Sequence, residues 1–254
     1  MTPTAARSAS PRRRSPSVRR RAHWERIYRT RSEEELSWHQ DEPRRSAELI
    51  RTYARPEDRI LDAGGGSSSL AERLAAFGFR DVTVVDVAKP ALERAAARAG
   101  TGTPAVRRVR ADLLCRPRLG TFDVWHDRAV FHFLTREKDR AAYLAHLRRC
   151  LAPGGLVVVA SFALDGPDTC SGLPVARYSP TGLAREFGTD FRLVRSGREL
   201  HRTPWGIRQP FSYAVLRYAP RTVGPPPANH RPAKPSRGLT DPERDGPGHP
   251  TVSK

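Results

Sequence analysis

Two acidic residues on either side of a run of glycines form the pattern that points most clearly to chemistry. Asp62 ends a short aliphatic run, and Asp86 ends a second one 24 residues later. Three glycines follow the first run: Gly64, Gly65 and Gly66. Glycine has no Cβ, so a nucleotide-like group can lie against such a loop at the start of a helix. A carboxylate at the end of the second strand can bind both ribose hydroxyls, so we expect a cofactor with a free ribose.

The order of residues in the glycine loop favours one cofactor over another. A dinucleotide site requires G-x-G-x-x-G with a pyrophosphate at the helix N-terminus, whereas Asp62 here lies two residues before Gly64 and the third glycine of that motif is missing. A carboxylate beside the glycines would repel a pyrophosphate but suits the ammonium group of a methionine moiety. The loop therefore predicts S-adenosylmethionine, and an NAD-dependent oxidoreductase is the less favoured alternative.

The surrounding elements indicate a doubly wound α/β sheet in a single domain. Unbroken aliphatic runs are typical of parallel strands buried on both faces, and the segment between the two acids has apolar residues at helical spacing. The last two expected strands alternate and have no helix between them, which indicates an antiparallel C-terminal hairpin at one edge. The expected helices are Glu42–Tyr53, Ser68–Phe77, Ala91–Ala99, Glu137–Leu151 and Pro180–Phe187. The seven expected strands are Arg59–Ala63, Val82–Asp86, Ala105–Arg110, Phe122–His126, Leu156–Ser161, Phe191–Leu200 and Gln209–Tyr218.

Positive charge is concentrated at the two ends of the chain, which carries a formal net charge of +18 over 254 residues. Residues 1–22 hold seven Arg and no acid, and residues 220–254 hold six Lys or Arg and three acids. Both ends are too poor in apolar residues to offset chain entropy, so we expect disordered tails around a domain at residues 23–219. Arg-rich tails can bind nucleic acid or an anionic membrane, and the first has the composition of an organellar transit peptide. Arg is abundant along the whole chain, which favours a simple solvated tail.

The cysteines and the apolar segments exclude several classes of protein. Cys115, Cys150 and Cys170 lie far apart with no C-x-x-C pair, so we expect neither a metal site nor a disulfide framework. Cys150 is expected in the core, and Cys170 lacks a nearby base that would make it a nucleophile. The longest apolar stretch, residues 156–164, is far shorter than the ~20 residues of a membrane helix. We expect a cytoplasmic protein without a membrane partner.

Three further segments are expected to face a substrate, because ligands of open α/β sheets bind beyond the carboxyl ends of the strands. They are residues 24–40, 125–133 and 165–178. In the first, Trp38 could belong to a lid that covers the cofactor or could anchor a helix. The second offers possible proton acceptors at His126, Asp127 and His132. It also offers a fixed cation, Arg128, for an anionic substrate or the cofactor carboxylate.

The ordered set of motifs resembles the class I, seven-stranded methyltransferases. Besides the glycine loop and Asp86, the resemblance rests on Arg110–Leu113, on Phe122–Trp125 and on the Pro-Gly-Gly turn within Leu151–Val159. It implies a Rossmann-like fold in which the glycine loop packs against the methionine end of the cofactor. It also implies that Asp112 and the backbone amide of Leu113 flank the adenine, and Val87 is included in this cofactor site.

Two families with different acceptors share local features with the chain. Residues 125–128, and Trp38 with the following His39 and Gln40, are similar to segments of thiopurine S-methyltransferases. Those enzymes have a different glycine loop. A comparable Asp-Arg pattern occurs in elongation-factor-type protein lysine methyltransferases. An Asn/Asp-Pro-Pro-Tyr motif is missing, which argues against methylation of DNA bases or glutamine. We expect a methyltransferase acting on a sulfur, nitrogen or oxygen nucleophile of a small molecule or protein. The alternative is an RNA-binding methyltransferase or a nucleic-acid-binding protein.

Overall fold

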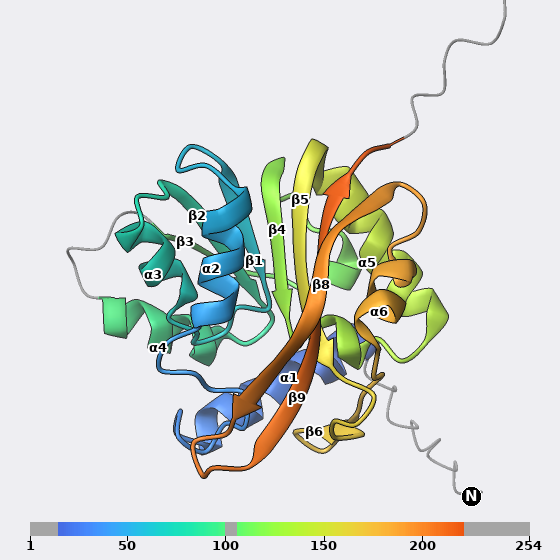
Figure 1. The fold of residues 1–254 in the computed structure, drawn as a ribbon. Helices are drawn as coiled ribbons and strands as arrows, with labels where there is room; N and C mark the ends of the chain where they lie inside the picture. Colours follow the sequence, from blue (N-terminus) through green and yellow to red (C-terminus); the bar gives the residue numbers. More distant parts are fainter. Residues whose placement is uncertain (1–14, 100–105, 221–254) are drawn as a thin grey trace, which may run out of the picture. The chain divides into compact units, whose positions relative to one another are not determined.

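The computed structural model of the chain describes residues 15–99 and 106–220 (Figure 1). Their strands form a seven-stranded sheet in the order β3-β2-β1-β4-β5-β9-β8 and a small two-stranded sheet of β6 and β7. The strands are β1 Arg59–Ala63, β2 Asp81–Asp86, β3 Val106–Arg110, β4 Phe122–Arg128, β5 Leu151–Phe162, β6 Thr169–Cys170, β7 Leu173–Pro174, β8 Phe191–Arg202 and β9 Arg208–Tyr218. The helices are α1 Pro16–Thr30, α2 Arg44–Tyr53, α3 Leu70–Ala76, α4 Lys89–Ala99, α5 Glu137–Cys150 and α6 Pro180–Glu186, with short 3₁₀ turns at Leu113–Cys115 and Phe131–Phe133.

The pairing of the strands confirms the expected doubly wound sheet. Strand β1 pairs in parallel with both β2 and β4, and β4 pairs in parallel with β5. Strand β9 is antiparallel to β5, and β8 is antiparallel to β9 at the edge, as the alternating pattern predicted. Because β1 to β5 all run the same way, their carboxyl ends meet at one edge of the sheet. Ligand-binding side chains of such sheets lie at this edge.

Each face of the sheet has its own apolar core, because neighbouring residues of a strand point to opposite faces. Leu61 and Trp125 pack in one core with residues of α5 and α6, whereas Ile60 and Val124 pack in the other core with residues of α2 and α3. The uninterrupted aliphatic runs of the central strands serve both cores at once. Helices therefore cover both faces, and the carboxyl edge carries the loops.

Helix α1 corrects the expected domain boundary at residue 22. Residues 16–22, which were expected in a disordered tail, form its first half. The Ser15 side chain accepts a hydrogen bond from the Val18 amide, and Pro16 occupies the first helical position. Arg20 also pairs with the distant Asp112, a contact that a count of apolar residues cannot detect. The remainder of the expected tails, residues 1–14 and 221–254, lies outside the described residues.

The β8–β9 hairpin reaches past the end of β5 at the same edge of the sheet. The last residue of β5, Phe162, pairs with Phe211, whereas the hairpin continues to its turn at residues 203–207. Its inner side holds the segment after α1, since His201 Nε2 donates to the Ser37 carbonyl at 2.7 Å. Figure 1 shows α1 lying near this hairpin, below the ends of the central strands. Within the described ranges no helix combines the length and apolarity needed to span a membrane.

Candidate active site

A large pocket, here called the main pocket, opens at the carboxyl edge of the sheet. Its empty space is about 870 Å³, including solvent at the mouth, which lies within the usual range for small-molecule sites. The ends of β2 and β4 form its floor, and α1 covers it. Most of the wall is apolar or aromatic, and it includes Trp24, Tyr28, Trp38, Val87, Leu113 and Phe133.

A smaller polar pocket, here called the side pocket, lies against the glycine loop. Its wall includes Gln40, Ser46, Asp62, Gly65 and His126. Three residues line both pockets, so the two are adjacent: Trp38, Gly64 and Arg128. A ligand lying across Gly64 would meet an apolar wall at one end and charged groups at the other.

The backbone of the glycine loop leaves no room for side chains. Gly64 and Gly66 have φ angles of +66° and +57°, which only glycine adopts without strain. A Cβ at Gly64 would collide with the Val130 side chain, and a Cβ at Gly66 would collide with the Tyr28 hydroxyl. Gly66 therefore makes room for α1, whereas Gly64 faces both pockets. Of the three predicted loop residues, Gly64 and Gly65 line a pocket wall.

Asp86, the last residue of β2, supplies a buried carboxylate to the wall of the main pocket, and its contact with a ribose stays a prediction. Its Oδ1 accepts a hydrogen bond of 2.7 Å from the Ala88 amide. Burial raises the pKa of Asp86 to about 6, the Asp62 charge adds to the effect, and hydrogen bonds from backbone amides oppose it. At neutral pH the group is an anion in a largely apolar pocket. Such a group is suited to accept hydrogen bonds from paired hydroxyls.

Asp112 also lines the main pocket, but both of its oxygens already have partners. Its Oδ2 accepts from Arg20 Nη2 at 2.7 Å and from Arg20 Nε at 3.2 Å. Its Oδ1 accepts from the Leu114 amide at 3.0 Å. Burial opposes ionisation of this carboxyl, yet hydrogen bonds from Ser17 and Arg20 hold its pKa below the usual value. If Asp112 contacts an adenine as predicted, its carboxylate would bind the adenine and Arg20 of α1 at the same time.

Arg128 is a partly buried arginine whose guanidinium has one free edge. Its Nη1 donates to the Trp38 carbonyl at 3.3 Å, and its planar group lies 4.4 Å from the centre of the Phe211 ring. Its Nε and Nη2 are buried and have no hydrogen-bond partner among the described residues. These two nitrogens form the edge of a guanidinium that binds a carboxylate in bidentate fashion. The free edge therefore indicates an anionic ligand group at the junction of the pockets.

The three predicted proton acceptors are buried, and none of them is in the wall of the main pocket. Both ring nitrogens of His126 are hydrogen-bonded, to Asp62 and Ser46. The carboxylate of Asp127 accepts hydrogen bonds from Tyr143 and from two backbone amides. His132 lies against Phe133 and Phe162, and burial together with the Arg128 charge lowers its pKa to about 3. This placement favours structural contacts, and the role as a base stays a prediction.

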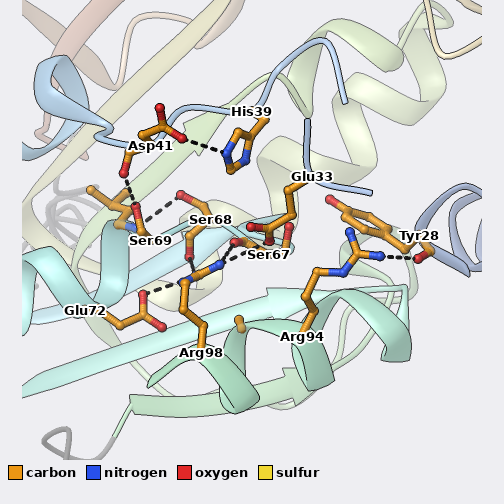
Figure 2. Close-up of polar contacts among 12 residues, drawn as sticks. Tyr28, Glu33, His39, Asp41, Ser67, Ser68, Ser69, Glu72, Arg94 and Arg98 are labelled. Atoms are coloured by element: carbon orange, nitrogen blue, oxygen red, sulfur yellow. Dashed lines mark hydrogen bonds and ion pairs between the residues drawn. The ribbon is translucent and has the colours of Figure 1, made fainter. Parts of the chain in front are cut away.

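Two arginines of α4 join the glycine loop to the segment around the end of α1 (Figure 2). Arg98 donates to the carbonyls of Ser67 and Ser68 at 2.7 and 2.9 Å. It also pairs with Glu33 at 3.1 Å. Arg94 donates to the Tyr28 carbonyl at 2.7 Å. Sequence reasoning did not detect these contacts, because arginines four residues apart on a helix are typical of a solvated face.

The cysteines are free thiols among the described residues. Cys150 is buried in the core as expected. Cys170 lies in β6 and lines the main pocket. Burial raises the pKa of the Cys170 thiol, which does not favour a nucleophilic thiolate. No group of three or more His, Cys, Asp or Glu in the part of the chain that the structure describes is placed to hold a metal ion.

The sequence is similar to known methyltransferases over part of its length. Residues 60–155 match a family described as a methyltransferase domain. The chain is 28% identical over 147 residues, 56% of its length, to an eEF1A lysine and N-terminal methyltransferase of Danio rerio. It is 32% identical over 72 residues, 28% of its length, to a homolog of that enzyme in Drosophila melanogaster. These matches span 21% and 10% of the two relatives, so the chain covers a minor part of each.

Solved structures share the fold at low sequence identity. One is a protein studied in the conversion of a disulfide bond into a thioacetal group during echinomycin biosynthesis, with a TM-score of 0.64, 22% identity and coverage of 77% of this chain and 91% of that one. Another is a SAM-dependent methyltransferase from Anabaena variabilis, with a TM-score of 0.62, 19% identity and coverage of 78% and 94%. A third is the Burkholderia thailandensis 1,6-didemethyltoxoflavin-N1-methyltransferase with bound S-adenosylhomocysteine, with a TM-score of 0.60, 18% identity and coverage of 86% and 94%.

Proposed function

We propose that this chain, which carries a class I S-adenosylmethionine-dependent methyltransferase domain, transfers a methyl group to a sulfur, nitrogen or oxygen nucleophile of a small molecule or a protein side chain. One observation carries the proposal. The apolar main pocket and the polar side pocket meet at Gly64. The cofactor likewise has an apolar purine with a ribose at one end and a charged amino acid at the other.

The residues of the main pocket fit the adenosine end. Asp86 is an anion in position to accept hydrogen bonds from the ribose hydroxyls. Val87 and Leu113 supply apolar wall, and Asp112 lies at the adenine end together with its partner Arg20. No other carboxylate lines this pocket among the described residues.

The residues around the side pocket fit the methionine end. Asp62 offers a buried carboxylate to the ammonium group. The free edge of Arg128 offers two donors to the carboxylate group. One anion and one cation at separate positions match the two charges of an α-amino acid.

When bound, S-adenosylmethionine supplies an electrophilic methyl group on a sulfonium centre. The part of the protein in this step is to position the acceptor in line with that group and to exclude water. The ring of Trp24 lies edge to face against Trp38 and Phe133, at centroid distances of 5.8 and 5.0 Å. These three rings line the main pocket, where they would keep water from the reacting atoms.

The class of acceptor is the open part of the proposal. A protein acceptor is supported by the similarity to eEF1A lysine and N-terminal methyltransferases. A small molecule is supported by the likeness to the 1,6-didemethyltoxoflavin-N1-methyltransferase. An RNA acceptor remains the alternative because of the seven arginines in residues 1–22. Since the cofactor is an intracellular metabolite, we place the activity in the cytoplasm.

Calorimetry with S-adenosylhomocysteine, S-adenosylmethionine and NAD tests the cofactor assignment. We expect binding of the first two ligands and none of NAD. Folded protein that binds neither adenosyl ligand would refute the proposed function. Transfer of a labelled methyl group from the cofactor into a fractionated cell extract then identifies the acceptor as a metabolite, a protein or an RNA.

A further inference from the structure

Three buried polar side chains form a continuous hydrogen-bonded chain along the side pocket. Ser46 Oγ lies 2.8 Å from His126 Nε2, and His126 Nδ1 lies 2.7 Å from Asp62 Oδ1. The exposed fractions of Ser46, His126 and Asp62 are 5%, 3% and 3%. All three residues belong to the wall of the side pocket. We call this arrangement the Ser46–His126–Asp62 chain.

The fold brings these residues together from three elements. Asp62 and His126 are paired in register on the neighbouring parallel strands β1 and β4. Paired residues of neighbouring strands point to the same face of a sheet, so both side chains face α2. Ser46 lies in the first turn of α2, and its side chain meets the ring from above the sheet. Ser46 was not detected by sequence reasoning, because nothing marks it in the sequence.

The chemistry of Ser46 and Asp62 determines the direction of the hydrogen bonds in the Ser46–His126–Asp62 chain. An ionised carboxylate only accepts hydrogen bonds, so His126 must donate from Nδ1 to Asp62. In the neutral ring Nε2 then has a lone pair, which accepts the hydroxyl proton of Ser46. Every donor in the chain thus points toward Asp62. The hydrogen bonds hold the Asp62 carboxylate in one orientation.

The second oxygen of Asp62 is directed toward the glycine loop. A Cβ at Gly65 would collide with Asp62 Oδ2, so this oxygen lies directly beneath the bare backbone of the loop. Besides Asp62 and His126, the side chains of the same pocket wall that can carry charge are Arg128, from β4, and His39, whose Nε2 lies 3.2 Å from Asp41 Oδ1. Asp62 is therefore the anion that an incoming ammonium group meets in this pocket.

We propose that Ser46 and His126 are positioning residues, which orient the Asp62 carboxylate toward the α-ammonium group of the cofactor. This inference rests on the proposed function. His126 acts through Asp62, and Ser46 acts through His126. In metal sites and catalytic triads the partner of a histidine fixes its tautomer and ring orientation in the same manner.

A comparison of two ligands tests the proposal. The affinities of wild type and Ser46→Ala are measured by calorimetry with S-adenosylhomocysteine and with its analogue that lacks the α-amino group. Loss of the Ser46 hydroxyl frees the His126 ring, and Asp62 is then held less firmly. Ser46→Ala is therefore expected to lower the affinity for S-adenosylhomocysteine by about threefold to tenfold. The affinity of the analogue should stay within about twofold of wild type, because this ligand has no group for Asp62 to hold.

Ser212→Ala is the matched control. Ser212 is a second buried serine, whose hydroxyl donates to the Tyr178 carbonyl at 2.7 Å, and it is absent from the walls of both pockets. This variant should leave both affinities unchanged. The ¹⁵N spectrum of the wild-type protein provides a second measurement, in which Nδ1 of His126 should be protonated and Nε2 should not.

The outcomes separate this inference from the proposed function. If Ser46→Ala lowered the affinities for both ligands equally, Ser46 would only support the fold, and the inference would be overturned. A deprotonated Nδ1 in the ¹⁵N spectrum would overturn it as well, even if Ser46→Ala did not fold. Wild-type protein that binds neither ligand would instead overturn the proposed function and this inference with it.

Discussion

Arg20 of helix α1 donates two hydrogen bonds to the same carboxylate oxygen of Asp112, at 2.7 and 3.2 Å, across 92 residues of sequence. Asp112 lines the main pocket at the end of β3, so this ion pair joins the N-terminal helix to the wall of the proposed cofactor site. The pair is partly buried, with exposed side-chain fractions of 30% and 11%. The helix that covers the pocket is thereby tied to a residue beneath it.

Replacement of Arg20 by Ala is expected to speed the release of S-adenosylhomocysteine. Without the ion pair α1 opens more readily, and we expect the dissociation rate to rise by about threefold to tenfold. Stopped-flow fluorescence of Trp24 and Trp38, which line the pocket, measures this rate. Arg29→Ala is the control, because Arg29 lies on the same helix, pairs with Glu25 and is absent from the wall of the main pocket. Equal rates in both variants and the wild type would contradict a role of the ion pair.

Replacement of Asp86 by Ala is expected to weaken cofactor binding by about 1.5 to 3 kcal/mol, because a charged acceptor for two hydroxyls is lost. Calorimetry with S-adenosylhomocysteine measures the change. Asp123→Ala is a suitable control, since Asp123 pairs with Arg59 away from the pockets. Wild-type affinity in Asp86→Ala would remove the assignment of Asp86 to the ribose.

Cofactor affinity should depend on pH through Asp86. Burial raises the pKa of this carboxyl to about 6, and the ribose hydroxyls need its ionised form as acceptor. Relative to its value near pH 7, the affinity should therefore fall by up to about tenfold for each pH unit below 6. Asp86→Asn should bind more weakly and show a flatter profile. An equally steep profile in Asp86→Asn would assign the dependence to another group.

Two substitutions of Asp127 distinguish a structural role of its carboxylate from a role as a proton acceptor in catalysis. Its Oδ1 accepts hydrogen bonds from the amides of Val130 and Phe131, and its Oδ2 accepts the Tyr143 hydroxyl. Asp127→Ala would leave these donors unpaired, so the free energy of unfolding should fall by about 1–3 kcal/mol. Asp127→Asn retains an oxygen for the two amides and should keep most of the stability and of kcat. A loss of kcat by several orders of magnitude in a stable Asp127→Asn variant would instead identify a base.

The free edge of Arg128 predicts a selective effect of Arg128→Lys. Lysine keeps the charge but cannot form the bidentate pair, so binding of S-adenosylmethionine should weaken by about tenfold. Binding of decarboxylated S-adenosylmethionine should change little, because that ligand has no carboxylate for the edge. Calorimetry with both ligands measures the difference. Equal losses for both would remove the carboxylate assignment.

The fold and several residues at the carboxyl edge of the sheet could be predicted from local patterns. Unbroken aliphatic runs, glycines at positions that require positive φ, and acids at strand ends are properties of neighbouring residues. They located the central strands β1, β2 and β4, the glycine loop and Asp86 without any knowledge of distant contacts. Helix α1 was missed in part because its stability comes from Ile27, Tyr28 and Arg20, whose partners lie elsewhere in the chain.

The sequence by itself thus determined the α/β architecture and placed the glycine loop and Asp86 at the ends of neighbouring strands, because hydrophobic periodicity and glycine content are properties of short segments. Only the tertiary structure decided what the polar residues after β4 do. His126 and Asp127 are neighbours in sequence, but adjacent strand residues point to opposite faces. The His126 ring therefore contacts Ser46 and Asp62, 80 and 64 residues away in the sequence. The Asp127 carboxylate accepts a hydrogen bond from Tyr143 on the other side of the sheet. Strand register and helix packing select such partners, and neither is visible in a local pattern.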